Sequence, residues 1–213
     1  MVKRGLSRDR LVEIAHECVS ANGLDALTMR RLASAAEVTP GALYKHLKDR
    51  RDLQRAMSDA VYATIELADI DIDNPSVTQV ITCCERMRAA MLGFRDGGRI
   101  VAGSYSPFAA TLKLSGTLMR LLQGIVQPPF QAGDIQSVLR SYTIGFVIEE
   151  QAYLELERVG EWEPLVATLT LNGPRLNSTG DTISIMTGER DRRFTAGLTA
   201  ILTGAVRTEP TSP

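Results

Sequence analysis

The chain has 213 residues, of which 44% are hydrophobic, 5% aromatic and 23% charged. This composition is typical of a folded protein with a buried core, and it excludes a disordered or fibrous chain. The longest uninterrupted apolar run, 144–148, is far shorter than the roughly 20 residues that cross a bilayer, so we expect no membrane contact. The basic start leads into an amphipathic pattern rather than an apolar signal core. Cys18, Cys83 and Cys84 lack disulfide or zinc-site spacing, so we expect a cytoplasmic protein without metal or cofactor.

Charge is distributed unevenly along the chain. The net charge is only -1, but residues 1–55 contain eleven Lys or Arg and seven Asp or Glu, which makes this segment basic and the remainder acidic. A small basic unit on an acidic body is typical of a protein that binds nucleic acid through one end. Chance clustering of charges on a solvated face is the alternative.

Four helices are predicted in the first third of the chain. Apolar residues at helical spacing predict a helix over 8–22, with Ser7 as its N-cap and Gly23 at its end. Thr28 is the predicted N-cap of a short helix over 29–36. The pair Thr39-Pro40 predicts another short helix that continues to Leu47, because proline is tolerated at the first helical position. Asp49 caps a longer fourth helix that reaches Ile65.

The remaining two thirds of the chain also have helical periodicity and no strand pattern. The predicted elements are helices over 77–94, 97–103, 107–126 and 134–159, a short helix with a mobile loop within 163–188, and a last helix over 190–206. The predicted fold class is therefore all-α, with a DNA-binding unit at 1–66 and a larger unit at 67–213.

The second and third helices, joined by the turn 37–39, have the arrangement of a helix-turn-helix motif, whose second helix enters the DNA major groove. Its predicted core comprises Leu27, Leu32, Val38, Leu43 and Leu47. We expect Lys45 to read guanine, Ala42 to touch a thymine methyl group, and phosphates to be held by Thr28, Tyr44, Lys48 and Arg50. His46 is either a phosphate donor, the simpler reading, or a titrating switch.

The segment LTMRRLASAAEVTPGALYKHLKDRRDL (27–53) resembles the DNA-binding head of tetracycline-repressor (TetR) family regulators, within a match over residues 7–66. FRDGGRIVAGS (94–104) and GFVIEEQ (145–151) resemble segments of the tetracycline-repressor ligand domain. The resemblance implies base-reading or nearby positions at Arg30, Thr39, Pro40, Gly41, Ala42, Tyr44 and Lys45. It implies phosphate contacts at Thr28, His46, Lys48 and Arg50.

The same resemblance places an inducer against the apolar stripe that includes Cys83 and Met87, which otherwise reads as ordinary core. The expected walls are Cys83, Met87, Val101, Tyr105, Leu114, Thr117 and Phe146, with Ser104, Ser141 and Glu149 as orienting polar groups. In the tetracycline repressors, magnesium-binding histidine, loop arginine and pocket histidine stand where this chain has Val101, Tyr105 and Ser141; an acidic residue is kept as Glu149. We therefore expect a largely apolar, ring-containing ligand that needs no metal.

The resulting prediction is a homodimeric repressor that binds a palindromic DNA operator and is released by a small-molecule inducer. In the last helix, Phe194, Leu198, Ile201 and Ala205 form a stripe expected to face the protomer's own core, while Gly197, Ala200 and Gly204 are expected to face a partner. The alternative is an architectural or partner-recruiting DNA-binding protein of the same fold without an inducer. An enzyme is not expected, because the adjacent Glu149 and Glu150 point about 100° apart on a helix and no nucleophile accompanies them.

Overall fold

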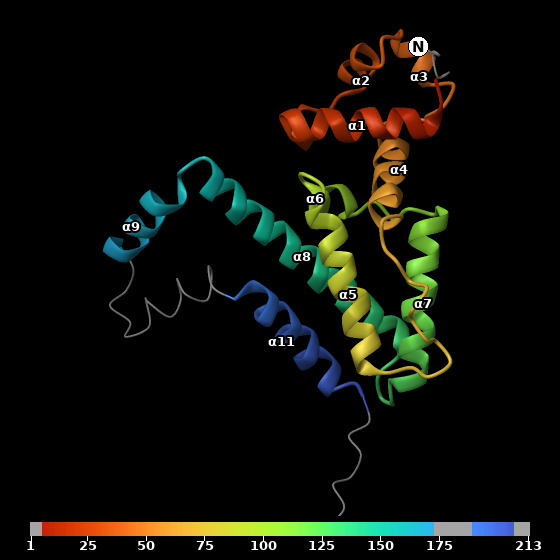
Figure 1. The fold of residues 1–213 in the computed structure, drawn as a ribbon, viewed down its shortest axis with the longest axis vertical. Coiled ribbons are helices and arrows are strands. Elements are labelled where there is room, and N and C mark those ends of the chain that lie inside the picture. Colours follow the sequence, from red (N-terminus) through yellow and green to blue (C-terminus); the bar gives the residue numbers. More distant parts are fainter. Residues whose placement is uncertain (1–5, 173–188, 207–213) are drawn as a thin grey trace, which may run out of the picture.

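The computed structural model describes residues 6–172 and 189–206. Its regular elements are helices throughout, and the part of the chain it describes contains no strand, only an isolated bridge between Val126 and Val206 (Figure 1). The all-α prediction is confirmed. Within the same residues, none of the helices combines the length and the apolar character that crossing a bilayer requires.

Three helices and a 3₁₀ turn form the end of the molecule at the top of Figure 1: α1 (Arg8–Asn22), η1 (Leu24–Ala26), α2 (Met29–Ala35) and α3 (Pro40–Leu43). The Ser7 hydroxyl accepts a hydrogen bond from the Arg10 N–H, and the Thr28 hydroxyl accepts one from the Arg31 N–H, each at 3.1 Å. Both predicted N-caps are confirmed, which explains why α1 and α2 begin where the sequence suggests.

The third helix is shorter than predicted. α3 ends at Leu43, not Leu47, and the Thr39 hydroxyl makes no capping bond. Two backbone groups that would continue the helix have other partners: the His46 carbonyl accepts a hydrogen bond from Arg8, and the Lys48 N–H donates to Asp52. The chain therefore turns into the next helix four residues early, with Leu43 and Leu47 still fully buried.

The turn between α2 and α3 has a left-handed residue that is not glycine. Glu37 has φ 55°, its N–H bonds to the Ser34 carbonyl, and the Val38 N–H bonds to the Ala33 carbonyl. These two bonds form a Schellman motif, which usually has glycine at this position. The glycine that usually indicates the end of a helix in a sequence is therefore absent after α2.

Six further helices belong to the body in the part of the chain that the structure describes, and α4 (Arg50–Tyr62) joins the body to the first part. These are α5 (Val77–Leu92), α6 (Gly97–Val101), α7 (Ala109–Ile125), α8 (Ala132–Arg158), α9 (Trp162–Asn172) and α11 (Arg190–Thr203). α4 stops three residues before the predicted Ile65, and the predicted ends of α5, α6, α7, α8 and α11 are within three residues of those observed. The short helix within 163–188 is confirmed as α9, whereas the predicted loop at 173–188 lies outside the described residues.

Two hydrophobic clusters make up the core, and α4 contributes to both. Leu53 and Met57 belong to the cluster under α1, whereas Val61 and Tyr62 belong to the cluster of the body. Ile100 of α6, with 0% of its surface exposed, belongs to the cluster under α1 although it is distant in sequence. The two parts of the molecule are therefore packed together around α4.

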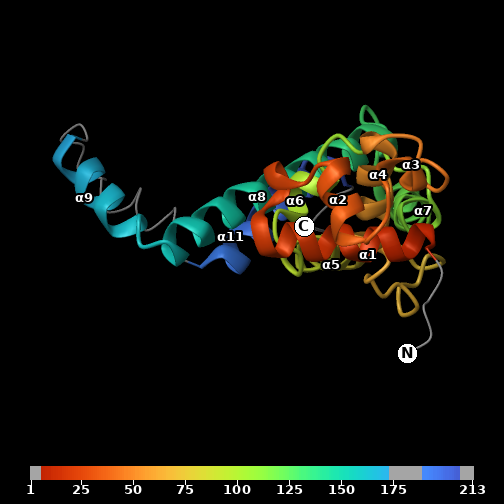
Figure 2. The same ribbon diagram turned by 90° about the horizontal axis from the view of Figure 1, so that it is seen from above.

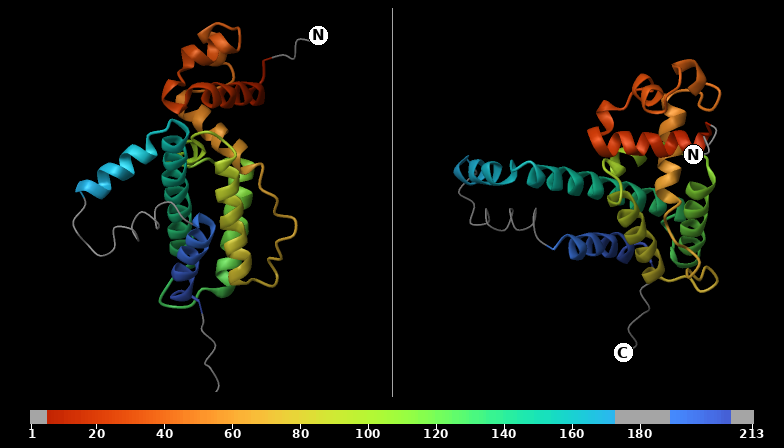
Figure 3. Two further views of the ribbon diagram at one scale, coloured as in Figure 1. Left: turned by 60° about the vertical axis from the view of Figure 1, so that its left-hand side comes forward. Right: turned by 45° about the horizontal axis from the view of Figure 1, so that its top comes forward.

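The second half of α8 and all of α9 extend away from the body in Figures 1 and 2 and in the right-hand view of Figure 3. This arm leaves apolar side chains uncovered, including Leu154 at 42%, Leu165 at 39% and Leu171 at 84% exposed. Such an apolar surface on a monomer is typical of a region that contacts another molecule.

One predicted position on α11 is wrong. Phe194, Leu198 and Ala205 are buried as expected, and Ile201 is half-buried. Gly197 does not face outward, because the Tyr142 side chain of α8 fills the space beside it and its hydroxyl donates to the Arg193 and Phe194 carbonyls. The outward face of α11 is instead made of Ala196, Thr199, Ala200 and Thr203.

Candidate functional site

The residues predicted to contact DNA lie on the elements at the end of the molecule farthest from α11 (Figure 1). Most are exposed: Thr28, Arg30, Thr39, Pro40, Gly41, Tyr44, Lys45, Lys48 and Arg50; Ala42 and His46 are half-buried. Beneath them, Leu27, Leu32, Leu43 and Leu47 are buried, and Val38 is half-buried against the same cluster. The predicted helix-turn-helix core is confirmed, and it presents to solvent the polar residues of α2 and of the segments on either side of α3.

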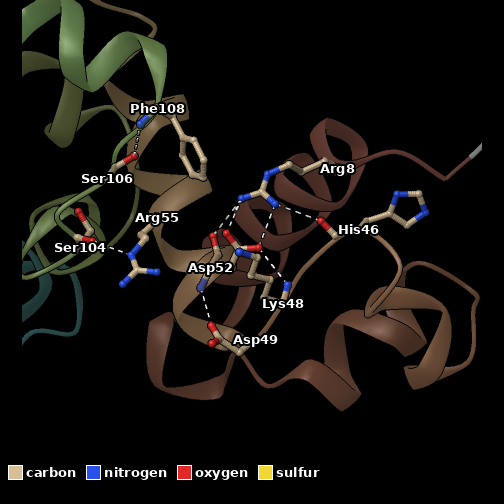
Figure 4. Close-up of polar contacts among 9 residues, drawn as sticks. All are labelled: Arg8, His46, Lys48, Asp49, Asp52, Arg55, Ser104, Ser106 and Phe108. Carbon is tan, nitrogen blue, oxygen red and sulfur yellow. Dashed lines mark hydrogen bonds and ion pairs between the residues drawn. The ribbon is translucent and has the colours of Figure 1, made fainter.

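Arg8 and Asp52 hold the segment that follows α3 in place (Figure 4). The Arg8 guanidinium donates to both carboxylate oxygens of Asp52 at 2.7 and 3.0 Å, and to the His46 carbonyl at 3.1 Å. Asp52 also accepts the Lys48 N–H at 2.9 Å, while the Asp49 carboxylate caps α4 through the Asp52 N–H. The hydrogen-bonded Arg8 guanidinium lowers the pKa of the Asp52 carboxyl from 3.8 to about 2, so the pair stays charged.

Polar contacts connect the DNA-facing end to the body. Arg55 of α4 donates to the Ser104 carbonyl at 3.3 Å (Figure 4), and the Asp96 carboxylate accepts the Leu24 N–H at 2.7 Å. In the same region, Arg99 of α6 pairs with Asp25 at 2.6 Å. These contacts join η1 and α4 to the segment around α6.

A cavity of about 450 Å³ lies in the body, with walls from α4, α5, α7, α8 and the loop between α6 and α7. Five of the predicted ligand residues line it: Met87, Ser104, Tyr105, Leu114 and Ser141. Phe146 and Glu149 instead line a second cavity of about 300 Å³ between α8, α9 and α11. The structure thus divides the predicted ligand site between two places.

Three predicted wall residues line neither of these cavities. Cys83, Val101 and Thr117 are buried, the first two completely. Burial raises the pKa of the Cys83 thiol to about 11, as expected for an inert core side chain. They are buried residues of the body and not wall residues of either cavity.

Two residues stand out among those that line the cavity but were missed by the sequence analysis. Tyr62, near the end of α4, and Arg140 of α8 both line the 450 Å³ cavity. Arg140 had a usable signal, since it is a charged residue beside a largely apolar stretch of α8. Tyr62 had no such signal, because the sequence pattern predicts an ordinary core residue of a helix at this position.

The adjacent acids Glu149 and Glu150 have different environments. Glu150 is buried and receives two hydrogen bonds of 2.7 Å from Arg88, which also pairs with Asp191 of α11 at 2.7 Å. Hydrogen bonding to Glu150 raises the pKa of Arg88, so this pair is a charged link between α5, α8 and α11. Glu149 is exposed. Across the described ranges, no group of three or more His, Cys, Asp or Glu side chains is placed to hold a metal ion.

Comparison with known families agrees with this arrangement. Residues 11–57 match the family described as "Bacterial regulatory proteins, tetR family", and residues 75–208 match "Tetracyclin repressor-like, C-terminal domain". The chain belongs to the TetR family. It is a transcriptional repressor with a helix-turn-helix head and a helical ligand-binding domain, and not an enzyme.

Similarity to individual TetR-family members extends over nearly the whole chain. Tetracycline repressor protein class C from Escherichia coli is 32% identical over 206 residues, covering 93% of this chain and 90% of the relative. The crystal structure of a possible TetR family transcriptional regulator from Streptomyces coelicolor A3(2) superposes with a TM-score of 0.76 at 30% identity, covering 93% and 98% of the two chains. The Streptomyces coelicolor TetR family protein ActR in complex with actinorhodin gives 0.75 at 26% identity, covering 96% of each.

Proposed function

We propose that this TetR-family repressor binds a palindromic operator as a homodimer and releases it when a small molecule fills the 450 Å³ cavity. The observation that carries the proposal is that the cavity and the DNA-facing end share α4. Tyr62 of α4 lines the cavity, and Asp52 at the other end of the same helix holds the segment after α3.

The DNA contacts follow from exposure and charge. We assign base reading to Lys45 and Arg30, which are exposed on the turn after α3 and on α2. Tyr44, Lys48 and Arg50 flank them and are suited to phosphates, which fix the position of the protein but carry little sequence information. His46 is assigned to phosphate as well, since Arg8 holds only its backbone carbonyl and leaves its ring available.

Two helix faces that none of the described residues covers support a homodimer. The outward face of α11, defined above, has only small side chains, and α8 adds the exposed Val138, Gly145 and Ala152. Small residues allow helices of two subunits to approach closely, and a twofold axis pairs each face with its copy. The arm of α9 then has a second subunit within reach to cover its exposed leucines.

We place the division between the units at residue 66, just beyond α4, and we assign residues 67–213 to ligand binding and dimerisation.

The ligand acts through its differential affinity for two conformers of the dimer. Filling the cavity favours a position of α4 in which the two heads no longer match successive major grooves. The free energy of operator binding that is lost equals the difference between the ligand's binding free energies for the two conformers.

The proposal is tested by selecting DNA from a random duplex library with the purified protein and measuring affinity for the selected sequences by fluorescence anisotropy. We expect a palindrome with half-sites about one helical turn apart and a strong decrease of affinity with salt. Native mass spectrometry of protein from its own host then tests for a retained ligand. Selected sites without twofold symmetry would contradict the dimeric mode, and operator affinity that no retained compound alters would favour the architectural alternative.

A further inference from the structure

The 450 Å³ cavity has a charge that the sequence did not predict. Among the described residues that line it, Arg140 is the one Lys, Arg, Asp or Glu side chain. No described carboxylate lies within ion-pair distance of Arg140; its guanidinium instead lies 5.3 Å from the centroid of the Tyr105 ring. The expected acidic group, Glu149, is outside this cavity. The cavity therefore has an excess of positive charge.

A buried donor accompanies this cation. Tyr62 is only 4% exposed, and its hydroxyl donates a hydrogen bond to no acceptor among the described residues. Burial raises the pKa of Tyr62 to about 12, partly offset by the nearby Arg140 guanidinium, so the hydroxyl keeps its proton. An unsatisfied hydroxyl in a native structure is costly, and this one lies on the wall of a cavity. It is available to donate to an acceptor inside.

One of the residues that line the cavity has a strained backbone. Tyr105 has φ 42°, a conformation that is rare for an aromatic residue, and its side chain is 79% exposed. Its ring lies against the Arg140 guanidinium. Backbone strain of this kind concentrates at ligand sites, where the surrounding structure maintains it.

We propose that the cavity binds an acidic, ring-containing molecule whose carboxylate pairs with Arg140 and accepts a hydrogen bond from the Tyr62 hydroxyl. The volume is within the range of about 300 to 1,000 Å³ typical of small-molecule sites. Met87, Leu114 and Leu118 supply apolar wall for the ring. The inference rests on the proposed function and names the ligand class for the same site. Arg140 favours a negatively charged ligand, whereas a carboxylate such as Glu149 would have favoured a positively charged one.

The test uses naphthalene-2-carboxylate and naphthalene-2-carboxamide, which share a ring system and differ in charge. Isothermal titration calorimetry of the full chain without DNA measures both affinities. We expect the wild type to bind the carboxylate at least about tenfold more tightly, as a charge-assisted pair predicts. Arg140→Gln removes this preference and Arg140→Lys restores part of it, whereas Arg120→Gln, an exposed arginine of α7 that does not line the cavity, leaves it unchanged.

Tyr62→Phe provides a second measurement with a distinct signature. It should weaken carboxylate binding severalfold yet leave the melting temperature of the free protein unchanged or higher, since it removes an unsatisfied buried hydroxyl. A merely structural tyrosine would lower the melting temperature and leave relative affinities for the two probes unaltered.

Equal affinity for the two probes, no binding of either at 1 mM, or a preference that survives in folded Arg140→Gln overturns the anion site. Operator affinity of the same variants is measured separately by anisotropy. A failed anion site with intact operator binding leaves the proposed repressor function standing, whereas a wild type without operator affinity contradicts that function whatever the calorimetry shows.

Discussion

The Asp59 carboxylate on α4 accepts two hydrogen bonds from Thr111 at the start of α7, one from its N–H and one from its hydroxyl, each 2.8 Å long. α7 has no capping side chain of its own at Phe108, so Asp59 performs this role from another helix. The helix that carries the head is thereby attached to a helix that lines the cavity.

We expect Asp59→Ala to lower the free energy of unfolding by about 1–2 kcal/mol, because it uncaps α7 and leaves its first N–H groups without this acceptor. Urea denaturation followed by circular dichroism measures the change. Asp73→Ala, in an exposed loop, is the matched control and should stay within about 0.5 kcal/mol of the wild type. Equal effects of the two substitutions would show that the capping bonds contribute nothing.

The Arg8–Asp52 pair predicts a specific dependence of stability on pH. The pKa of Asp52 is about 2 in the folded state and 3.8 as its ordinary value, so its stabilising contribution is present above about pH 4 and lost as the pH falls toward 2. Asp52→Asn should lower the free energy of unfolding by about 1–2 kcal/mol at pH 6, and less at pH 3. Urea titrations of both proteins between pH 3 and 6 check this; a constant difference over that range would be inconsistent with the assigned shift.

The left-handed conformation of Glu37 predicts an unusual response to substitution. Glu37→Gly should be neutral or stabilising by up to about 1 kcal/mol, because glycine adopts φ 55° without the steric penalty. Glu37→Val should destabilise by about 1–2 kcal/mol, since β-branched residues strongly disfavour this region. Thermal unfolding ranks the three proteins, and a valine variant as stable as the glycine variant would disprove the assigned turn geometry.

Lys45 and Arg50 should differ in how their removal affects DNA binding. Lys45→Ala is expected to cost about 1–3 kcal/mol on the selected operator and little on random DNA, because a base contact carries specificity. Arg50→Ala should weaken both DNAs similarly and flatten the salt dependence by about one counterion. Competition anisotropy separates the two patterns; equal proportional losses for Lys45→Ala would remove it from base reading.

The outward face of α11 can be tested by adding bulk at Ala200. Ala200→Arg should yield a monomer with reduced operator affinity, because a long charged side chain prevents close approach of two copies of this face. Ala89→Arg on the exposed side of α5 is the matched control and should remain dimeric. Analytical ultracentrifugation at micromolar concentration gives the answer, and a monomeric wild type would refute the dimer proposal itself.

Most of the fold could be predicted because its signals are local. The hydroxyl caps at Ser7 and Thr28 and the apolar stripe of α1 depend on neighbours within a few residues. The end of α3 could not be predicted in the same way, since it depends on Arg8 and Asp52, which approach it only in the folded chain.

The ligand site was less predictable because the direction of a side chain on a helix depends on which elements cover it. Glu149 and Glu150 have the same chemistry and adjacent positions, yet Arg88 of another helix decides which one is buried. Similarly, Gly197 reads as a partner-facing residue until Tyr142 occupies the space beside it. The spacing of residues in the sequence predicts neither the burial of Glu150 nor the position of Tyr142 beside Gly197.

The burial of Ile100 beneath α1 limits how modular this protein is. A chimaera that replaces only residues 1–66 with the head of a relative leaves Ile100, and Phe108 beside the Arg8 guanidinium, facing side chains they were not matched to. Transplanting operator preference intact therefore requires moving α6 and the loop after it together with the head, so the functional unit of exchange is discontinuous in sequence.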